Sequence, residues 1–382
     1  MALTAYTAQD LYQWLIHKEN FLLLDVRNNE EFGRFKVEGP FPFNMINVPY
    51  MEFIEHEDES VAKVPAGETI RIVCAKEGSA KYVGEILEGR GFDDVGYLTL
   101  GIKSWGNMLS PVEIGGGKDY RLFQFIRPGK ASCSYGLLCG NEMMVFDPAK
   151  NIDAYVDFAK QHGARIVKTF ETHRQADYIS GSLPLYRAVG AHIMAPGGDF
   201  EGARFDYTAV KDGDRFAFSG AEPLVNAIHT PGHTPGSTCY LIDNRYLISG
   251  DTVFIYSIGR PDLGGKAEEW SKLLFATMQD KIIPIEDDTM VLPGHYMDWS
   301  EADPRLAFAE TLGQIKEKNR SIYGIDNEAD FFGFIKSNMR KQPDEYAKIR
   351  EINAGFDEPE MEQQDILDLG KNECAASAMG RG

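Results

Sequence analysis

The run Thr172-His173-Arg174-Gln175-Ala176-Asp177-Tyr178 decides the fold of this chain. Residues 164–170 come directly before it, and their apolar pattern predicts a buried strand. Open α/β sheets hold their ligands at the carboxyl ends of the strands, which is where this strand delivers His173 and Asp177. Imidazole and carboxylate groups are ligands that proteins use for transition metals. The run therefore indicates an α/β fold with a metal site at this edge of the sheet.

Three further motifs follow, and each lies close to a predicted strand. Short apolar runs predict these strands near 225–229, 238–242, 246–249 and 289–292. The motifs are His229-Thr230-Pro231-Gly232-His233, Ser249-Gly250-Asp251-Thr252 and Pro293-Gly294-His295-Tyr296. Side chains at the ends of successive strands can converge on one cation, and Asp251 is a carboxylate able to bridge two. We therefore expect His233, Asp251 and His295 to join the site.

The four motifs in this order resemble those of the metallo-β-lactamase superfamily. The first motif of that family reads T-H-x-H-x-D-H, and here Gln175 and Tyr178 stand in place of its second and third histidines. The resemblance implies a metallo-β-lactamase-like αββα sandwich, which we place at residues 118–355. Upstream, residues 143–148 predict a strand and residues 152–162 a helix, which fit this fold.

The same resemblance implies two metal sites, each of which has lost one ligand. One site maps onto His173, Gln175, His233 and Asp251, and the other onto Asp177, Tyr178, His295 and Asp251. A glutamine oxygen is a weaker ligand than imidazole for a transition metal. A tyrosine ligates well only as a phenolate, which is costly near neutral pH. A tight binuclear centre, and with it a zinc-dependent hydrolase, is therefore the lower-ranked interpretation.

Two other segments resemble bacterial persulfide dioxygenases. They are Ile258-Gly259-Arg260-Pro261-Asp262-Leu263-Gly264 and Gln342-Pro343-Asp344-Glu345-Tyr346-Ala347-Lys348-Ile349. Those enzymes hold one Fe(II) by two histidines and one carboxylate and oxidise a persulfide, such as glutathione persulfide, to sulfite and the thiol. Mapped here, the triad is Gln175, His233 and Asp251. Arg260 could bind a substrate carboxylate or form a structural salt bridge.

Three outcomes stay open for this site. It can bind iron weakly, with Gln175 or a redirected His173 as third ligand. It can bind another metal, with zinc as the alternative, through His173, His233, Asp251 and Asp177. Or the domain can be catalytically silent and support a sulfurtransferase.

A second candidate site lies near the N-terminus, in Cys74-Ala75-Lys76-Glu77-Gly78-Ser79-Ala80. This loop joins a strand predicted at 69–74 to a helix predicted at 80–87. A loop there points backbone N–H groups at one place next to a helix N-terminus, which favours an anion and lowers a thiol pKa. Lys76 adds positive charge, and Gly78 permits a tight turn. We therefore expect Cys74 to be a nucleophile.

The surrounding motifs resemble a single rhodanese domain, which we place at residues 1–114. They are Leu23-Leu24-Asp25-Val26-Arg27, Glu31-Phe32, Asn47-Val48-Pro49, the Cys74 loop, Gly101 and Trp105. The resemblance implies a rhodanese-like α/β domain in which Cys74 carries sulfane sulfur, with Arg27 and Glu31 in the framework near it. Thiosulfate and sulfite are then expected partners, beside the persulfide. A homo-oligomer is expected from the resemblance alone.

Composition limits the classes of partner and the compartment. The formal net charge of −19 argues against nucleic acid and anionic membranes, because phosphate would be repelled. We see no apolar run long enough to span a membrane and no basic and apolar leader at the start, so we expect a cytoplasmic protein. Five scattered cysteines without CxxC spacing fit free thiols in a reducing compartment.

The C-terminal extension, residues 356–382, is acidic and then rich in small residues, and we expect it to be partly mobile. Cys374 within it is then either an incidental exposed cysteine or a second thiol for sulfur relay. Residues 115–119, with three glycines, predict a hinge or turn. Together these features predict a persulfide-oxidising enzyme coupled to sulfur transfer through Cys74, or a sulfurtransferase whose second domain is silent.

Overall fold

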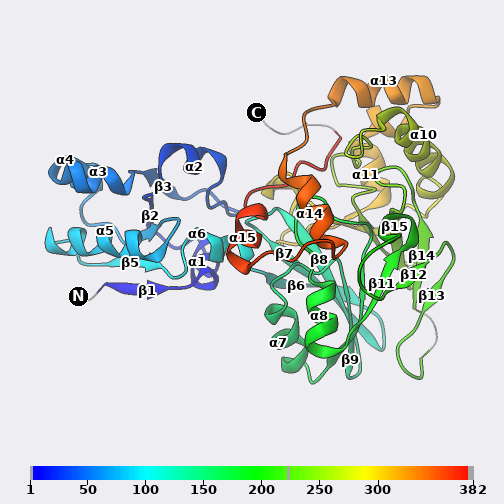
Figure 1. Cartoon of the computed structure of the whole chain (residues 1–382), viewed down its shortest axis with the longest axis horizontal. Coiled ribbons are helices and arrows are strands. Elements are labelled where there is room, and N and C mark those ends of the chain that lie inside the picture. Colours follow the sequence, from blue (N-terminus) through cyan, green and yellow to red (C-terminus); the bar gives the residue numbers. More distant parts are fainter. Residues whose placement is uncertain (1–2, 222–223, 377–382) are drawn as a thin grey trace. The chain divides into compact units, whose positions relative to one another are not determined.

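A computed structural model describes residues 3–221 and 224–376 of the chain. These residues form two compact units (Figure 1). The first unit runs to Ser110 and includes Arg127–Lys130 and Leu369–Lys371, and the second comprises the other described residues. In the described part, no helix is long and apolar enough to cross a membrane.

The first unit contains a five-stranded parallel sheet in the order β1-β5-β4-β2-β3. Its strands are β1 (Thr4–Tyr6), β2 (Leu22–Asp25), β3 (Asn44–Asn47), β4 (Ile70–Val73) and β5 (Val95–Leu98). Every residue of β2 is buried, as expected of a parallel strand that is covered on both faces. The predicted strands at the start of this chain are therefore confirmed within one residue at each end.

Six helices complete this unit. They are α1 (Ala8–Ile16), α2 (Asn29–Arg34), α3 (Tyr50–Glu55), α4 (Glu57–Ala62), α5 (Glu77–Gly89) and α6 (Ile102–Asn107). Helix α1 begins with a capping box, because Thr7 Oγ1 accepts from the Asp10 backbone N–H and Asp10 accepts from that of Thr7. Helix α5 buries Ala80, Val83 and Leu87 against the sheet. The helix predicted at 80–87 thus starts three residues earlier.

The second unit contains two sheets. The first has the order β12-β11-β10-β9-β8-β7-β6, and its strands are β6 (Ser110–Gly116), β7 (Tyr120–Arg127), β8 (Ser132–Cys139), β9 (Glu142–Phe146), β10 (Arg165–Phe170), β11 (His192–Pro196) and β12 (Thr208–Val210). The second has the order β13-β14-β15-β16-β17-β18, and its strands are β13 (Arg215–Phe216), β14 (Val225–His229), β15 (Thr238–Ile242), β16 (Tyr246–Gly250), β17 (Met290–Pro293) and β18 (Glu310–Thr311). The strands predicted from β9 onward are confirmed within two residues.

Helices follow and cover these strands. They are α7 (Asp153–Gln161), α8 (Ser182–Val189), α9 (Gly197–Phe200), α10 (Ala267–Thr277) with its π-helical continuation Met278–Ile282, the short 3₁₀ turn Trp299–Glu301, α11 (Leu312–Lys318), α12 (Arg320–Tyr323), α13 (Glu328–Asn338), α14 (Glu345–Asn353) and α15 (Met361–Leu367). On the outer face of the first sheet, Phe125 packs edge-on against Phe158 of α7. On the outer face of the second, Leu247 and Val291 share a buried cluster with Leu274 of α10.

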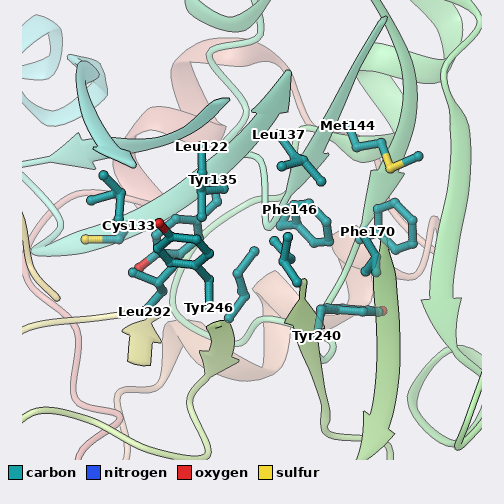
Figure 2. Packing of buried hydrophobic residues seen from close by; sticks show 14 of the residues in the cluster. Leu122, Cys133, Tyr135, Leu137, Met144, Phe146, Phe170, Tyr240, Tyr246 and Leu292 are labelled. Carbon is teal, nitrogen blue, oxygen red and sulfur yellow. The ribbon is translucent and has the colours of Figure 1, made fainter. Parts of the chain in front are cut away.

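The two sheets face each other across the largest apolar core. Figure 2 shows Phe146 and Phe170 from the first sheet opposite Tyr240 from the second. The rings of Phe146 and Phe170 stack with centroids 4.7 Å apart, and Tyr240 meets Phe170 edge-on at 5.2 Å. Burying such rings accounts for the face-to-face packing of the sheets. The predicted αββα sandwich is therefore confirmed.

Two local predictions concern the glycine-rich segment and the C-terminal extension. Gly115 and Gly116 are the last residues of β6, and the predicted hinge or turn is a tight turn in which the Gly117 N–H donates to the Tyr120 carbonyl. The C-terminal extension is ordered as far as it is described, because α15 and residues 372–376 make specific contacts. Residues 377–382, which include the predicted mobile end, lie outside the described residues.

Candidate functional site

His173, His233 and Asp251 form one buried group at the ends of strands. His173 follows β10, His233 lies in the turn between β14 and β15, and Asp251 follows β16. Asp251 Oδ2 lies 3.8 Å from His173 Nε2 and 3.5 Å from His233 Nε2. Each of the three side chains is at most 2% exposed. The carboxylate and both imidazoles therefore direct one donor atom each to a shared point.

Hydrogen bonds at Nδ1 fix how the two rings face Asp251. The Thr172 hydroxyl donates to Asp147, so it must accept from His173 Nδ1–H, 2.9 Å away. His233 Nδ1–H donates to the Arg260 carbonyl at 3.0 Å. A proton held at Nδ1 leaves Nε2 with a free lone pair, which is the form that ligates metals.

The charges in this group suit a metal. Burial lowers the pKa of His233 to about 4, against the opposing pull of Asp251, so the ring is neutral near pH 7. Burial alone would raise the pKa of Asp251. The charge of His295 and its hydrogen bond to Asp251, together with the other two histidines, instead hold this pKa well below its usual range. Asp251 Oδ2 accepts no hydrogen bond from the described residues. Two imidazole nitrogens and a free carboxylate oxygen fit a divalent transition metal.

Gln175 lies on the other side of His173. Its Nε2 lies 3.4 Å from His173 Nδ1, the nitrogen that does not face Asp251. The donor atom that completes two histidines and one carboxylate is therefore His173 Nε2. Of the two alternatives for the third ligand, Gln175 and His173, this geometry favours His173.

Asp177, His295 and Cys374 form a second buried group beside the first. His295 Nε2 lies 2.9 Å from Asp177 Oδ2, and His295 Nδ1 donates to Asp251 Oδ1 at 2.7 Å. Burial opposes a charge on His295, but the two carboxylates outweigh it and raise the pKa of His295 to about 10. One donor atom from each of the three residues lies within 4.8 Å of the other two. Asp177 thus belongs to this group and not to the first.

Cys374 was expected in a mobile tail, and this expectation is wrong. Its side chain is 1% exposed. The Cys374 carbonyl accepts from the Arg260 N–H at 2.9 Å, and the Ala376 N–H donates to the Ile258 carbonyl at 2.8 Å. Burial raises the pKa of the thiol well above its ordinary value, and the charges of Asp177 and Asp251 add to this. Two small residues, Ala375 and Ala376, follow Cys374, but no motif in the local sequence predicts this contact.

Tyr178 does not replace the missing histidine as a ligand. Its hydroxyl donates to the Asp147 carbonyl at 3.3 Å. Burial and the nearby Asp147 raise the pKa of Tyr178 well above its ordinary value, so the phenolate form is absent near neutral pH. This geometry agrees with the expectation that a tyrosine at this position is a poor metal ligand near neutral pH.

Sequence reasoning missed a third acid near the site. Glu171 directly follows β10, the strand that precedes His173, and the Ser182 hydroxyl donates to its Oε1 at 2.5 Å. Burial, with the nearby Asp147, raises the pKa of Glu171 to about 8. A carboxyl that stays protonated near pH 7 adds no negative charge beside the two groups.

A cavity of about 350 Å³ opens beside His233. Its walls include Leu263, Trp270, two arginines, Arg174 and Arg350, and one acid, Asp199. Among the described residues, Arg174 Nε is buried without a hydrogen-bond partner. Burial and the charge of Arg174 lower the pKa of Arg350. Two cations that repel each other at one cavity favour an anion there.

Arg260 is engaged within the protein. Its Nε and Nη2 each donate to a different oxygen of Asp262 at 2.6 Å, and the side chain is 4% exposed. This bidentate pair fits the alternative of a structural salt bridge. The two donors that would bind a substrate carboxylate are already used by Asp262.

Cys74 lies at the end of β4 in the first unit and is 4% exposed. The backbone N–H groups of Lys76 and Ala75 and the hydroxyl of Ser79 act to lower the pKa of the thiol, as in the predicted cradle. Burial nevertheless outweighs these groups and raises the pKa of the thiol. The expected lowering of this pKa is therefore wrong, because burial cannot be read from the loop sequence.

The rest of the loop follows from helix α5. Glu77 and Gly78 belong to its first turn, so Gly78 does not form the expected tight turn. Glu77 Oε2 accepts from the Leu100 N–H at 3.0 Å. The residue that must be glycine is Gly101, whose φ is +68° and whose missing Cβ would meet the Ala75 carbonyl at 2.5 Å.

Arg27 and Glu31 stand close to each other but play unequal parts. Arg27 forms a buried ion pair with Asp25 at 2.6 Å and donates to the Phe35 carbonyl. Glu31 is exposed, and its carboxylate accepts from the Asn28 side chain at 2.9 Å. Arg27 therefore holds together the loop after β2, in keeping with a framework role.

Family models match both units. Residues 7–108 match the rhodanese-like domain, and residues 148–295 match the metallo-β-lactamase superfamily. The chain belongs to the metallo-β-lactamase superfamily and carries a rhodanese-like domain ahead of the matching region.

Curated relatives support the same family. A hydroxyacylglutathione hydrolase of Rhizobium johnstonii is 30% identical over 199 residues, which cover 50% of this chain and 75% of that protein. One from Anaeromyxobacter dehalogenans is 33% identical over 192 residues, which cover 50% and 70%. These proteins indicate an enzyme of this fold, and the family generally binds metal.

Two solved structures are similar. A metallo-β-lactamase from Staphylococcus aureus has a TM-score of 0.55 and 27% identity, and the match covers 62% of this chain and 73% of that one. ETHE1 from Myxococcus xanthus has a TM-score of 0.52 and 20% identity, and the match covers 62% and 99%. The second likeness concerns the fold alone.

The buried cation at His295 leads to a stability prediction. Replacing His295 by Gln leaves Asp177 and Asp251 without their shared partner, which should cost the metal-free protein about 3–5 kcal/mol of unfolding free energy near pH 6. The folded-state pKa of about 10 lies above the unfolded value of about 6.5. The stabilisation is therefore fully present below pH 6.5 and declines as the pH rises towards 10.

Urea unfolding of chelator-treated protein across this pH range measures the difference. His192→Gln, at an exposed position of β11, is the matched control and should unfold as the unmodified protein does. A His295→Gln deficit that stays constant or grows from pH 6.5 to 10 would contradict the ion pair.

Proposed function

We propose that this protein oxidises a low-molecular-weight persulfide, such as glutathione persulfide, to sulfite with one Fe(II). The observation that carries the proposal is the set of His173, His233 and Asp251, in which two imidazole nitrogens and one carboxylate oxygen converge. Such a set suits Fe(II) that reacts with O₂ and substrate, because three protein ligands leave positions open. The rhodanese-like domain would then handle the sulfane sulfur through Cys74.

The protein's own residues would hold and orient the iron. His173 and His233 would each offer Nε2, while Thr172 and the Arg260 carbonyl keep their Nδ1 protons in place. Asp251 would offer Oδ2, while its Oδ1 stays bound to His295. Iron held by these ligands would supply the chemistry by which O₂ oxidises the persulfide. Ligands that are already oriented would lose little entropy when the iron binds.

The cavity beside His233 supports a small anionic substrate. Its volume of about 350 Å³ lies within the range of small-molecule sites. Arg174 and Arg350 would bind a carboxylate of glutathione persulfide, and Trp270 and Leu263 would cover its apolar part. Arg260, by contrast, would support the loop that carries the carbonyl partner of His233.

The rhodanese-like domain would transfer sulfur by exchange at Cys74. The Cys74 thiolate would attack the outer sulfur of a persulfide, forming a new S–S bond while the low-molecular-weight thiolate leaves. Sulfite would then attack that outer sulfur, which forms thiosulfate and returns the thiolate. The N–H groups of Ala75 and Lys76 would stabilise the negative charge in both steps, as in an anion-binding loop.

A zinc-dependent hydrolase is the second candidate, and the curated relatives favour it. Both relatives described above are named hydroxyacylglutathione hydrolases. The same cavity would then take a glutathione thioester. Hydrolysis of S-lactoylglutathione that depends on added zinc would support this alternative over the oxygen-dependent reaction.

Oxygen consumption tests the leading function. Protein loaded anaerobically with Fe(II) should consume O₂ when glutathione persulfide is added. Asp251→Asn and His173→Ala each remove a ligand and should lower the rate by at least about 100-fold. Gln175→His should change the rate little, because Gln175 lies on the Nδ1 side of His173. No uptake by the unmodified protein, with uptake gained in Gln175→His, would mean that the triad needs a histidine at position 175.

The two arginines should decide the choice of substrate. Arg174→Gln and Arg350→Gln should each raise the KM for glutathione persulfide about 10- to 100-fold, the equivalent of one charge-assisted hydrogen bond. The KM for an uncharged persulfide, that of 2-mercaptoethanol, should stay nearly unchanged. Steady-state oxygen uptake measures both. Equal effects on the two substrates would contradict a carboxylate-binding role.

Cys74 should act independently of the iron site. Cys74→Ser should abolish the transfer of sulfur to sulfite and leave oxygen uptake unchanged, because the thiol lies in the other domain. In the unmodified protein the transfer rate should rise with pH above neutrality, since burial raises the pKa of the thiol and the thiolate reacts. Thiosulfate formation measures the transfer, and formation that survives in Cys74→Ser would sink the assignment.

A further inference from the structure

The group of Asp177, His295 and Cys374 has the composition of a metal site of its own. We propose that it binds a thiophilic divalent ion, Zn²⁺, and that the C-terminal segment completes it with the Cys374 thiolate. One donor atom from each residue lies within 4.8 Å of the other two, and all three side chains are buried. The proposal concerns metal binding and does not depend on the reaction proposed above.

His295 already has the orientation of a metal ligand. Its Nδ1–H donates to Asp251 Oδ1 at 2.7 Å, which is the carboxylate–histidine arrangement found behind many zinc ions. Its Nε2 is buried and makes no hydrogen bond of good geometry to the described residues. It lies 2.9 Å from Asp177 Oδ2, which is shorter than the separation of about 3–4 Å that Zn–ligand bonds of about 2.0–2.3 Å impose on neighbouring ligands. A bound ion would therefore take the place of the Nε2 proton and move these two atoms slightly apart.

The backbone of the C-terminal segment is held on both sides of Cys374. Gly259 and Ala375 form an antiparallel bridge, and the Glu373 N–H donates to the Tyr346 hydroxyl at 2.8 Å. Arg340 donates to the Ala375 carbonyl at 2.9 Å. The partners in these bonds come from several segments of the second unit. The fold itself therefore holds the thiol next to Asp177 and His295.

Charge and chemistry favour a cation here. Asp177 and Asp251 are two buried carboxylates that lie against the single imidazole of His295. Buried charges are stable when they are paired or coordinate a metal. Thiolate, imidazole and carboxylate are the ligand types that zinc takes, and three protein ligands leave a fourth position for water or substrate. Tyr178, which turns to the Asp147 carbonyl, leaves this role to Cys374.

Cobalt(II) is the probe, because a thiolate ligand gives it an intense near-ultraviolet charge-transfer absorption. Chelator-treated, reduced full-length protein titrated anaerobically with Co²⁺ should bind two equivalents and develop this absorption. Cys374→Ser should bind one equivalent and lack the absorption, while the weaker visible bands of the remaining cobalt persist. Cys139→Ser, a partly exposed thiol in β8, is the matched control and should behave as the unmodified protein does.

The unmodified protein alone can overturn the proposal. A saturated titration without the charge-transfer absorption would exclude a thiolate ligand, whatever the variants do, and would leave the iron triad untouched. Absorption that persists in Cys374→Ser and vanishes in Cys139→Ser would also overturn it. Asp177→Asn offers a second approach that keeps the thiol: loss of one cobalt equivalent supports the site, and two equivalents with unchanged absorption contradict it.

Discussion

The buried carboxylate of Asp251 is the constraint on which the rest of the site depends. Its Oδ2 faces His173 and His233, and its Oδ1 is bound to His295, so a single side chain joins both candidate metal groups. The backbone packs closely around it: a Cβ at Gly294 would lie 2.6 Å from Asp251 Oδ1, and one at Gly259 would lie 1.8 Å from its carbonyl. A carboxylate enclosed this tightly stays ionised only if buried partners stabilise its charge, and His295 does so by donating a hydrogen bond to Oδ1.

The sandwich explains how residues so far apart in sequence reach this carboxylate. Strands β10, β14 and β16 come from two different sheets, yet the segments that follow or join them meet at one edge. The stacked rings of Phe146 and Phe170, with Tyr240 edge-on against Phe170, fix the spacing of the sheets from within. The packing of the core therefore sets the positions of the donor atoms and organises the site in advance.

Much of this could be predicted from the sequence, and the failures have physical causes. Apolar runs predicted the strands, and motifs close to the strand ends predicted His233 and Asp251 as site residues. Both predictions succeed because they depend on local sequence. The choice between Gln175 and His173 stayed open, since only the hydrogen bond at Nδ1 shows that His173 Nε2 faces Asp251. Burial of Cys74 and Cys374 depends on contacts far along the chain, so their raised thiol pKa values had no local signal.

The replacements in the first motif, Gln175 and Tyr178, therefore do not by themselves exclude metal binding. Gln175 lies on the side of His173 away from Asp251. A glutamine in place of a histidine at this position therefore removes no donor from the group of His173, His233 and Asp251. Tyr178 does remove one, but Cys374 brings a sulfur to the same buried acids from nearly 200 residues further along the chain. What the site requires is a balance of charge and a number of inward-facing donor atoms. A fold can meet that requirement with side chains from any segment whose backbone it can hold in place, as hydrogen bonds to Arg260 and Ile258 hold this one.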